Sequence, residues 1–160
     1  MSIFSFFRRR KKRERIDPFT LTDPWRSFVQ DAQQAESRFD RIVATVQDGP
    51  LRERLGDIHQ RVNDGLLACW RIAQSGHHLH KMVLAVADTN SESLTRMRAR
   101  EAETRDKLAA LTHNLDEAVA RAAELATGQF AGVDAVADDV NSVVSDLEAL
   151  RQAIAEITPS

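Results

Sequence analysis

The sequence predicts an all-α protein, an elongated antiparallel bundle of about four helices with a coiled-coil-like hairpin, preceded by a basic disordered tail. Two observations lead to this fold class. Apolar residues recur at alternating spacings of three and four along much of the chain, which is the period of a helix that buries one face. Aromatic residues make up only 6% of the chain and Tyr is absent, which disfavours a β-sandwich. We divide the chain into an N-terminal tail and linker at residues 1–22 and a helical bundle at residues 23–158.

The most regular pattern lies between Leu94 and Leu125, where the spacing continues without a Pro or a Gly. We expect one amphipathic helix of about 48 Å, at about 1.5 Å per residue, that needs partner helices along its length. The seam positions are Leu94, Met97, Glu101, Thr104, Leu108, Leu111, Leu115, Ala118, Ala122 and Leu125.

Pro, Gly and capping residues predict where the first two helices begin and end. Asp23 as N-cap and Pro24 at the first helical position start a helix that ends near Gln47. The Asp-Gly-Pro sequence at residues 48–50 breaks it and starts a second helix, which continues to about Val86.

The same signals bound the last two helices. Thr89 and Glu92 have the spacing of a capping box, and Gly128 suits the end of the third helix. The fourth helix carries apolar residues at the same spacing, namely Val133, Val136, Val140, Val143, Leu147, Leu150, Ile154 and Ile157.

Folding each pair of helices back on itself predicts two antiparallel hairpins. A turn at residues 48–49 places Phe28 opposite Cys69, and it places Ala32 opposite Gly65 at the closest approach. The same test pairs the third helix with the fourth. An extended coiled coil that dimerises is the alternative, but short turns between helices favour antiparallel neighbours within one chain.

The seam of the third helix weakens where the fourth helix ends. Glu101 and Thr104 occupy seam positions there, and we expect these layers to face the second helix, a partner or water. Leu94, Met97, Glu101 and Thr104 are therefore the candidate partner-binding residues, for another protein or for a second copy of this chain.

The first fifteen residues differ in charge from the rest of the chain. They carry a net charge of +6, whereas the whole chain carries −2, which leaves −8 on the remaining residues. Large apolar side chains beside clustered cations can enter a bilayer interface while the cations attract anionic headgroups, at up to about 1 kcal/mol per charge. The candidate membrane-binding residues are Ile3, Phe4, Phe6, Phe7, Arg8, Arg9, Arg10, Lys11, Lys12, Arg13 and Arg15.

Three other interpretations of the tail stay open. Its charges could simply be solvated, or they could bind the phosphates of nucleic acid, although an acidic body would repel such a partner. The tail could also dock on the acidic fourth helix. In the membrane interpretation, residues 16–22 form a spacer that holds the bundle off the membrane.

No cluster of residues predicts catalysis or a metal site. The sequence has no nucleophile elbow, P-loop, dinucleotide-binding glycine pattern or paired zinc dithiol. Cys69 lies near three histidines in the sequence (His77, His78 and His80), but Cys69 and His80 would be about 16 Å apart along a straight helix. We predict no catalytic residue, no metal and no cofactor.

The chain lacks the signals of an integral membrane protein. A membrane-spanning helix needs about 20 apolar residues, and no stretch of the chain approaches that length. The apolar run at residues 3–7 is also too short for a signal peptide, and the positive charges follow it instead of preceding it. The single cysteine cannot form an internal disulfide. We expect a cytoplasmic protein that is peripheral at the inner face of the membrane.

Three short stretches carry a resemblance to known proteins. Asp-Pro-Trp-Arg at residues 23–26, Gly-Pro-Leu-Arg at residues 49–52 and Cys-Trp-Arg-Ile-Ala at residues 69–73 resemble a group of small helical actinobacterial proteins. The resemblance covers residues 17–157. It implies a bacterial cytoplasmic protein and brings no catalytic or binding residue with it.

Together these features predict a non-enzymatic helical adaptor or scaffold that attaches peripherally to an anionic membrane surface and binds a protein partner. The alternative is a dimeric helical protein that uses the basic tail to contact nucleic acid.

Overall fold

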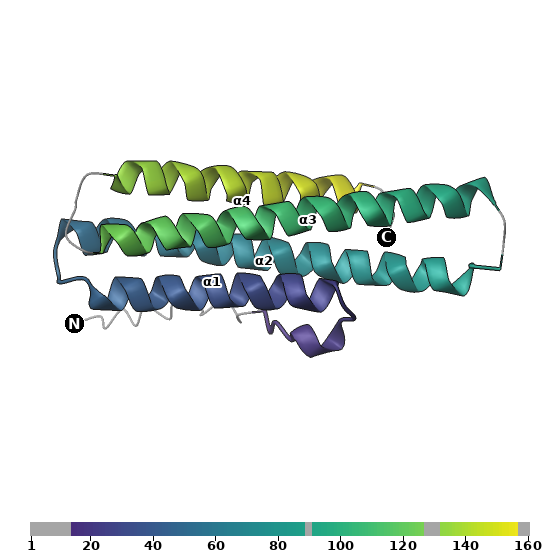
Figure 1. The fold of residues 1–160 in the computed structure, drawn as a ribbon, viewed down its shortest axis with the longest axis horizontal. Coiled ribbons are helices and arrows are strands. Elements are labelled where there is room, and N and C mark those ends of the chain that lie inside the picture. Colours follow the sequence, from purple (N-terminus) through teal and green to yellow (C-terminus); the bar gives the residue numbers. More distant parts are fainter. Residues whose placement is uncertain (1–13, 89–90, 127–131, 157–160) are drawn as a thin grey trace, which may run out of the picture.

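The computed structural model describes residues 14–88, 91–126 and 132–156. Four long helices run side by side along one axis, as Figure 1 shows. The described residues contain no strand, and the predicted all-α bundle is confirmed. The elements are the 3-10 helix η1 (Pro18–Thr20) and the α-helices α1 (Trp25–Thr45), α2 (Pro50–Ala85), α3 (Glu92–Leu125) and α4 (Val133–Ala155).

The helix boundaries agree with the predicted ones to within a few residues. α2 begins at Pro50 as expected, whereas α1 begins at Trp25, later than predicted. Pro24 takes the N-cap position because its carbonyl accepts the first helical hydrogen bond, from the Phe28 amide at 3.2 Å. Asp23 instead accepts a hydrogen bond from the Ser27 hydroxyl at 2.9 Å.

The third helix has a different cap from the predicted one. The Ser91 hydroxyl accepts a hydrogen bond from the Leu94 amide at 3.2 Å, so Ser91 is the N-cap. Thr89, which we expected to cap this helix, lies outside the described residues. Gly132 precedes α4 with φ of 112°, a left-handed conformation that glycine adopts without strain.

The helices pack in a four-cornered arrangement. α2 packs against α1 and α4, α3 packs against the same two helices, and α2 and α3 also touch each other. α1 and α4 lie at opposite corners with no contact between their described residues. The core between them is apolar, and its largest fully buried side chains include Trp25, Phe39, Leu55, Ile72, Leu108, Leu115 and Leu147.

The predicted hairpin of α1 and α2 forms, and the small residue at position 65 makes room for α4. The Cys69 thiol lies 3.8 Å from the Phe28 carbonyl, as the predicted layer requires. A Cβ built on Gly65 would lie 3.0 Å from Val144 Cγ2 of α4. The absence of a side chain at Gly65 thus lets α4 pack closely on α2, a role that the predicted pairing with Ala32 did not include.

Ion pairs join neighbouring helices along the rim of the bundle. Arg38 of α1 contacts Asp116 of α3 at 2.6 Å, and Arg61 of α2 contacts Glu148 of α4 at 3.0 Å. Arg54 of α2 likewise contacts Asp134 of α4 at 3.1 Å. Exposed pairs of this kind contribute about 1 kcal/mol or less each, so the apolar core carries most of the stability.

Candidate functional site

α2 and α3 project beyond the other two helices at one end of the bundle (Figure 1). α1 begins at Trp25, whose ring lies against Gly76 of α2, and α4 ends at Ala155. We call the projecting part, residues 77–88 and 91–101, the tip. Among the described residues, neither α1 nor α4 continues along this pair of helices.

The two helices of the tip are held together by a small core and one polar contact. Val83 of α2 and Leu94 of α3 are both buried. His80 Nδ1 lies 2.6 Å from Glu101 Oε1, and the Glu101 side chain is only 15% exposed. The tip is therefore a defined extension of the bundle.

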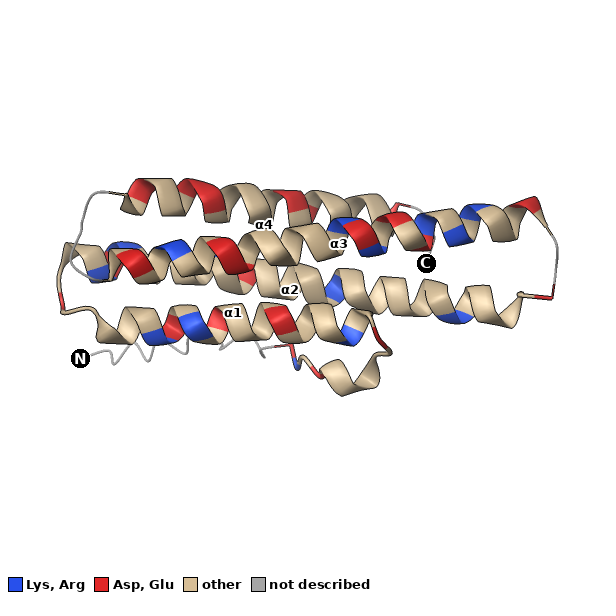
Figure 2. Ribbon diagram, viewed as in Figure 1, with Lys and Arg blue, Asp and Glu red and all other residues tan. Residues whose placement is uncertain are grey.

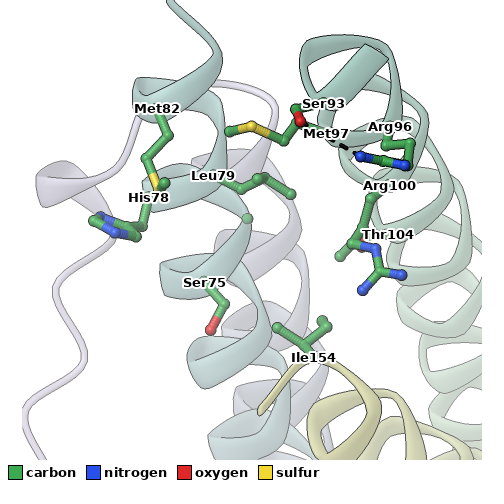
Figure 3. Close-up of a pocket in the computed structure, with 11 residues that line it drawn as sticks. Ser75, His78, Leu79, Met82, Ser93, Arg96, Met97, Arg100, Thr104 and Ile154 are labelled. Atoms are coloured by element: carbon green, nitrogen blue, oxygen red, sulfur yellow. Dashed lines mark hydrogen bonds between the residues drawn. The ribbon is translucent and has the colours of Figure 1, made fainter. Parts of the chain in front are cut away.

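A groove of about 400 Å³ runs between α2 and α3 where the tip meets the bundle. Figure 3 shows Leu79 of α2 and Ile154 of α4 pointing into it, with Met97 of α3 above them. Gly76 and Thr104, both buried, lie deeper in the groove. Its walls are thus apolar, and residues from three helices form them.

Two arginines of α3 also line this groove. Arg96 donates a hydrogen bond to the Ser93 hydroxyl at 3.4 Å and lies 3.9 Å from a Glu92 carboxylate oxygen, while Arg100 interacts electrostatically with Glu103. None of the described lining residues is Asp or Glu. Figure 2 shows the contrast with α4, whose tan ribbon carries several red, acidic segments. The groove therefore combines an apolar interior with two arginines whose acidic neighbours, Glu92 and Glu103, lie outside its lining.

Exposed apolar side chains gather at the same end of the molecule. Four large hydrophobic residues are exposed among those described, and three of them belong to the tip: Met82, Leu84 and Val86. The fourth, Phe19 of η1, lies under the Arg26 guanidinium, with 5.8 Å from Arg26 Cζ to the ring centroid. Clustered exposed apolar residues mark interaction surfaces more often than scattered ones do.

The structure separates the four candidate partner-binding residues of α3. Met97 and Thr104 line the groove. Leu94 is buried against the chain itself, and Glu101 faces α2 through its contact with His80. The weak layers of the seam thus face α2, which was one of the alternatives, and a partner would meet Met97 before it met the other three.

Most of the predicted membrane-binding residues, Ile3 to Arg13, lie outside the described residues; Arg15 is described and exposed. The expected spacer at residues 16–22 is wrong as a spacer, because this segment packs on the bundle. Leu21 joins the core at 4% exposure, Pro18 is buried, and the Thr22 hydroxyl lies 3.0 Å from His77 Nδ1. Glu14 also contacts Arg71 of α2 at 3.2 Å.

The cysteine and histidines take up separate structural positions. Cys69 is buried, and burial, followed by the nearby Asp31 charge, raises the pKa of its thiol to about 12. His77 contacts Thr22, His80 contacts Glu101, and His78 lines the groove. Within the part of the chain that the structure describes, no group of three or more His, Cys, Asp or Glu residues is arranged to hold a metal ion.

None of the helices in the described ranges is long and apolar enough to cross a membrane. No protein-family model, curated protein or solved structure matches this chain.

The groove residues that sequence reasoning missed are Leu79, Met82, Arg96 and Arg100. One signal pointed to them. The predicted fold-back places Phe28 opposite Cys69, only one turn after the predicted start of α1 at Pro24, so the later part of α2 lacks a partner in α1. Following α2 past that layer would have shown apolar positions without a covering helix.

Proposed function

We propose that this protein is a non-enzymatic helical adaptor that attaches peripherally to an anionic membrane surface through residues 1–15 and binds a protein partner through its bundle. The observation that carries the proposal is the composition of those residues. Four large apolar side chains adjoin seven cations, and the body behind them has the opposite charge. Each signal alone gives marginal membrane binding, and two together give stable, reversible attachment.

The packing of residues 16–22 supports a short connection between tail and bundle. Since Ile16 and Leu21 pack against the core, the tail leaves the molecule next to the helices. In this proposal the bundle lies close to the membrane surface and does not stand off it on a free linker.

The acidic face of α4 is a weaker candidate for binding the tail. Three of its carboxylates already have arginine partners within the bundle: Asp134 contacts Arg54, Asp139 contacts Arg121 and Glu148 contacts Arg61. A tail docked there would compete with these pairs. The membrane offers a dense array of anionic groups without that competition.

Cosedimentation of the full-length protein with lipid vesicles tests the attachment. We expect binding to vesicles that contain phosphatidylglycerol, weaker binding at high salt, and none to phosphatidylcholine alone. Changing the six cations at residues 8–13 to Ser should abolish binding, whereas the matched change Arg98→Ser, at an exposed cation of α3, should not. Equal binding by the six-cation variant would refute the attachment.

The nucleic-acid alternative predicts a different outcome. A basic tail that binds phosphates would shift duplex DNA in a gel, and the affinity would fall steeply as salt rises. Vesicle binding that is absent while DNA binding depends on residues 8–13 would replace the membrane proposal with this one.

A further inference from the structure

We infer that the groove at the tip binds an amphipathic helix with acidic residues, contributed by the protein partner. The inference rests on the proposed function only in taking the partner to be a protein. Its own basis is the groove: an apolar channel between two helices, with cations on one wall and no described acidic residue in its lining.

The positions where α1 begins and α4 ends within the described residues define the shape of the occupant. Along the rest of the bundle, α1 and α4 cover the apolar faces of α2 and α3, but α1 starts opposite Gly76 and α4 stops at Ala155. From Gly76 to Ala85, α2 continues for ten residues, about 15 Å at the usual helical rise. A guest helix of two to three turns fits that length, with apolar anchors at positions i, i+4 and i+7.

The lining determines the side chains that such a helix needs. Leu79, Met82, Met97 and Ile154 offer an apolar surface, and unbranched Met side chains adjust to different guest residues. Arg96 and Arg100 flank this surface from α3. Their own acidic neighbours hold these arginines weakly: Arg96 lies 3.9 Å from Glu92 on an exposed surface, and Arg100 interacts with Glu103 beyond ion-pair distance. A guest carboxylate can therefore pair with either arginine.

A second copy of the tip is a poorer occupant. Two tips packed groove to groove would bring the arginines that line one groove, Arg96 and Arg100, into the interface with those of the other, and like charges in an interface are unfavourable. A flat membrane is also a poorer occupant, because Gly76 and Thr104 are buried at the bottom of a concave groove and lie beyond the reach of a planar surface.

Selection from a short-peptide display library against the full-length protein tests the inference. We expect enriched peptides with apolar residues at helical spacing and Asp or Glu beside them. Synthetic copies should bind about tenfold or more weakly to the Arg96→Glu, Arg100→Glu double variant, because two attractions become repulsions. The matched variant Arg98→Glu makes the same charge change on the same helix outside the groove, and it should bind as wild type does.

A second variant tests the apolar part without threatening the fold. Met82 is 43% exposed, so Met82→Ser should leave the protein folded, with an unchanged thermal midpoint, but weaken peptide binding. Enrichment of basic or sequence-independent peptides, or equal binding by the double variant, would overturn the inference. So would a wild-type dimer that Met82→Ser dissociates, since a second copy would then occupy the groove.

The two proposals fail separately. The six-cation tail variant should keep full peptide binding, and the Arg96→Glu, Arg100→Glu variant should keep full vesicle binding. If the double variant loses vesicle binding and no peptide is selected, the tip is a membrane-contacting surface and the inference is wrong. If the six-cation tail variant still binds vesicles but the Arg96→Glu, Arg100→Glu variant loses peptide binding, the membrane attachment is wrong. The inference about the groove then still holds.

Discussion

The ring of Trp25 lies so close to Gly76 that no larger residue fits between α1 and α2 at this point. A Cβ built on Gly76 would lie 2.4 Å from both Cη2 and Cζ3 of the indole, well inside van der Waals contact. Trp25 is fully buried, and its ring also meets Phe28 edge-on with 6.0 Å between centroids. The contact places the first residue of α1 level with Gly76 of α2, and the tip begins at the next residue of α2.

Replacing Gly76 by Ala should destabilise the protein, although Ala favours a helix. The gain in helix propensity is at most about 1 kcal/mol, whereas displacing a fully buried indole costs about 1 to 3 kcal/mol. Gly56→Ala is the matched control, since nothing lies within 4 Å of its Cβ position, and it should raise stability. Urea denaturation measures both. A Gly76→Ala variant as stable as Gly56→Ala would show that this packing is misassigned.

The contact between His80 and Glu101 changes what we expect from substitution at residue 101. The seam pattern alone predicts that Glu101→Leu is tolerated or stabilising, because Leu completes an apolar stripe. The 2.6 Å contact with His80 instead predicts a loss of about 1 kcal/mol, with Glu101→Gln less harmful. A double-mutant cycle with His80→Ala should give a coupling of about 0.5 to 1 kcal/mol. Additive effects would mean that the two side chains do not interact.

Shortening the seam residues of α3 to Ala should lower the stability of the protein by different amounts at different positions. Leu115 is fully buried, so Leu115→Ala should cost about 2 to 5 kcal/mol through the cavity it leaves. Leu111 lies one turn earlier and is only partly buried, so Leu111→Ala should cost clearly less. Chemical denaturation of the two variants compares them directly. Equal losses would indicate that the register of α3 differs from the one described.

The link between residue 22 and α2 should weaken in acid. The Thr22 amide donates to His77 Nδ1 at 3.3 Å, which requires an unprotonated nitrogen. Burial first, and then Lys81, His80 and His78, lower the pKa of His77 below 6.5, so the unfolded chain binds the proton more readily. The stabilising contribution is therefore present above about pH 6.5 and is lost as pH falls through the lower pKa of the folded state.

His77→Asn tests this dependence because the amide oxygen of Asn can replace the Nδ1 acceptor without titrating. Urea midpoints measured from neutral to mildly acidic pH should fall less for the variant than for the wild-type chain. The same fall in both proteins would mean that His77 contributes nothing to the acid sensitivity.

Sequence patterns predicted the helices well because Pro, Gly and apolar spacing act locally. The start of α2 at Pro50, most of the seam from Leu94 to Leu125 and the pairing of Phe28 with Cys69 follow from them. The burial of Thr112 and Val119, which lie outside the predicted seam, does not. The proximity of Gly65 to Val144 does not. Amphipathic spacing shows which face of a helix is apolar, but a four-cornered bundle gives α2 several neighbours that compete for that face.

Two features of the candidate site depend on contacts that have no periodic pattern. Leu21 and Pro18 pack on the bundle from a segment too short to show one. The groove arises where α1 and α4 stop, and its position depends on the Trp25–Gly76 contact and on the end of α4. The tail composition, in contrast, could be read directly from the sequence.

Localising the full-length protein as a C-terminal fluorescent fusion in bacterial cells tests the proposed membrane attachment most directly. We expect signal at the cell periphery for the wild-type chain, and diffuse signal when the six cations at residues 8–13 are changed to Ser. Wild-type signal that is diffuse or lies over the nucleoid, or peripheral signal that persists in the six-cation variant, would contradict it.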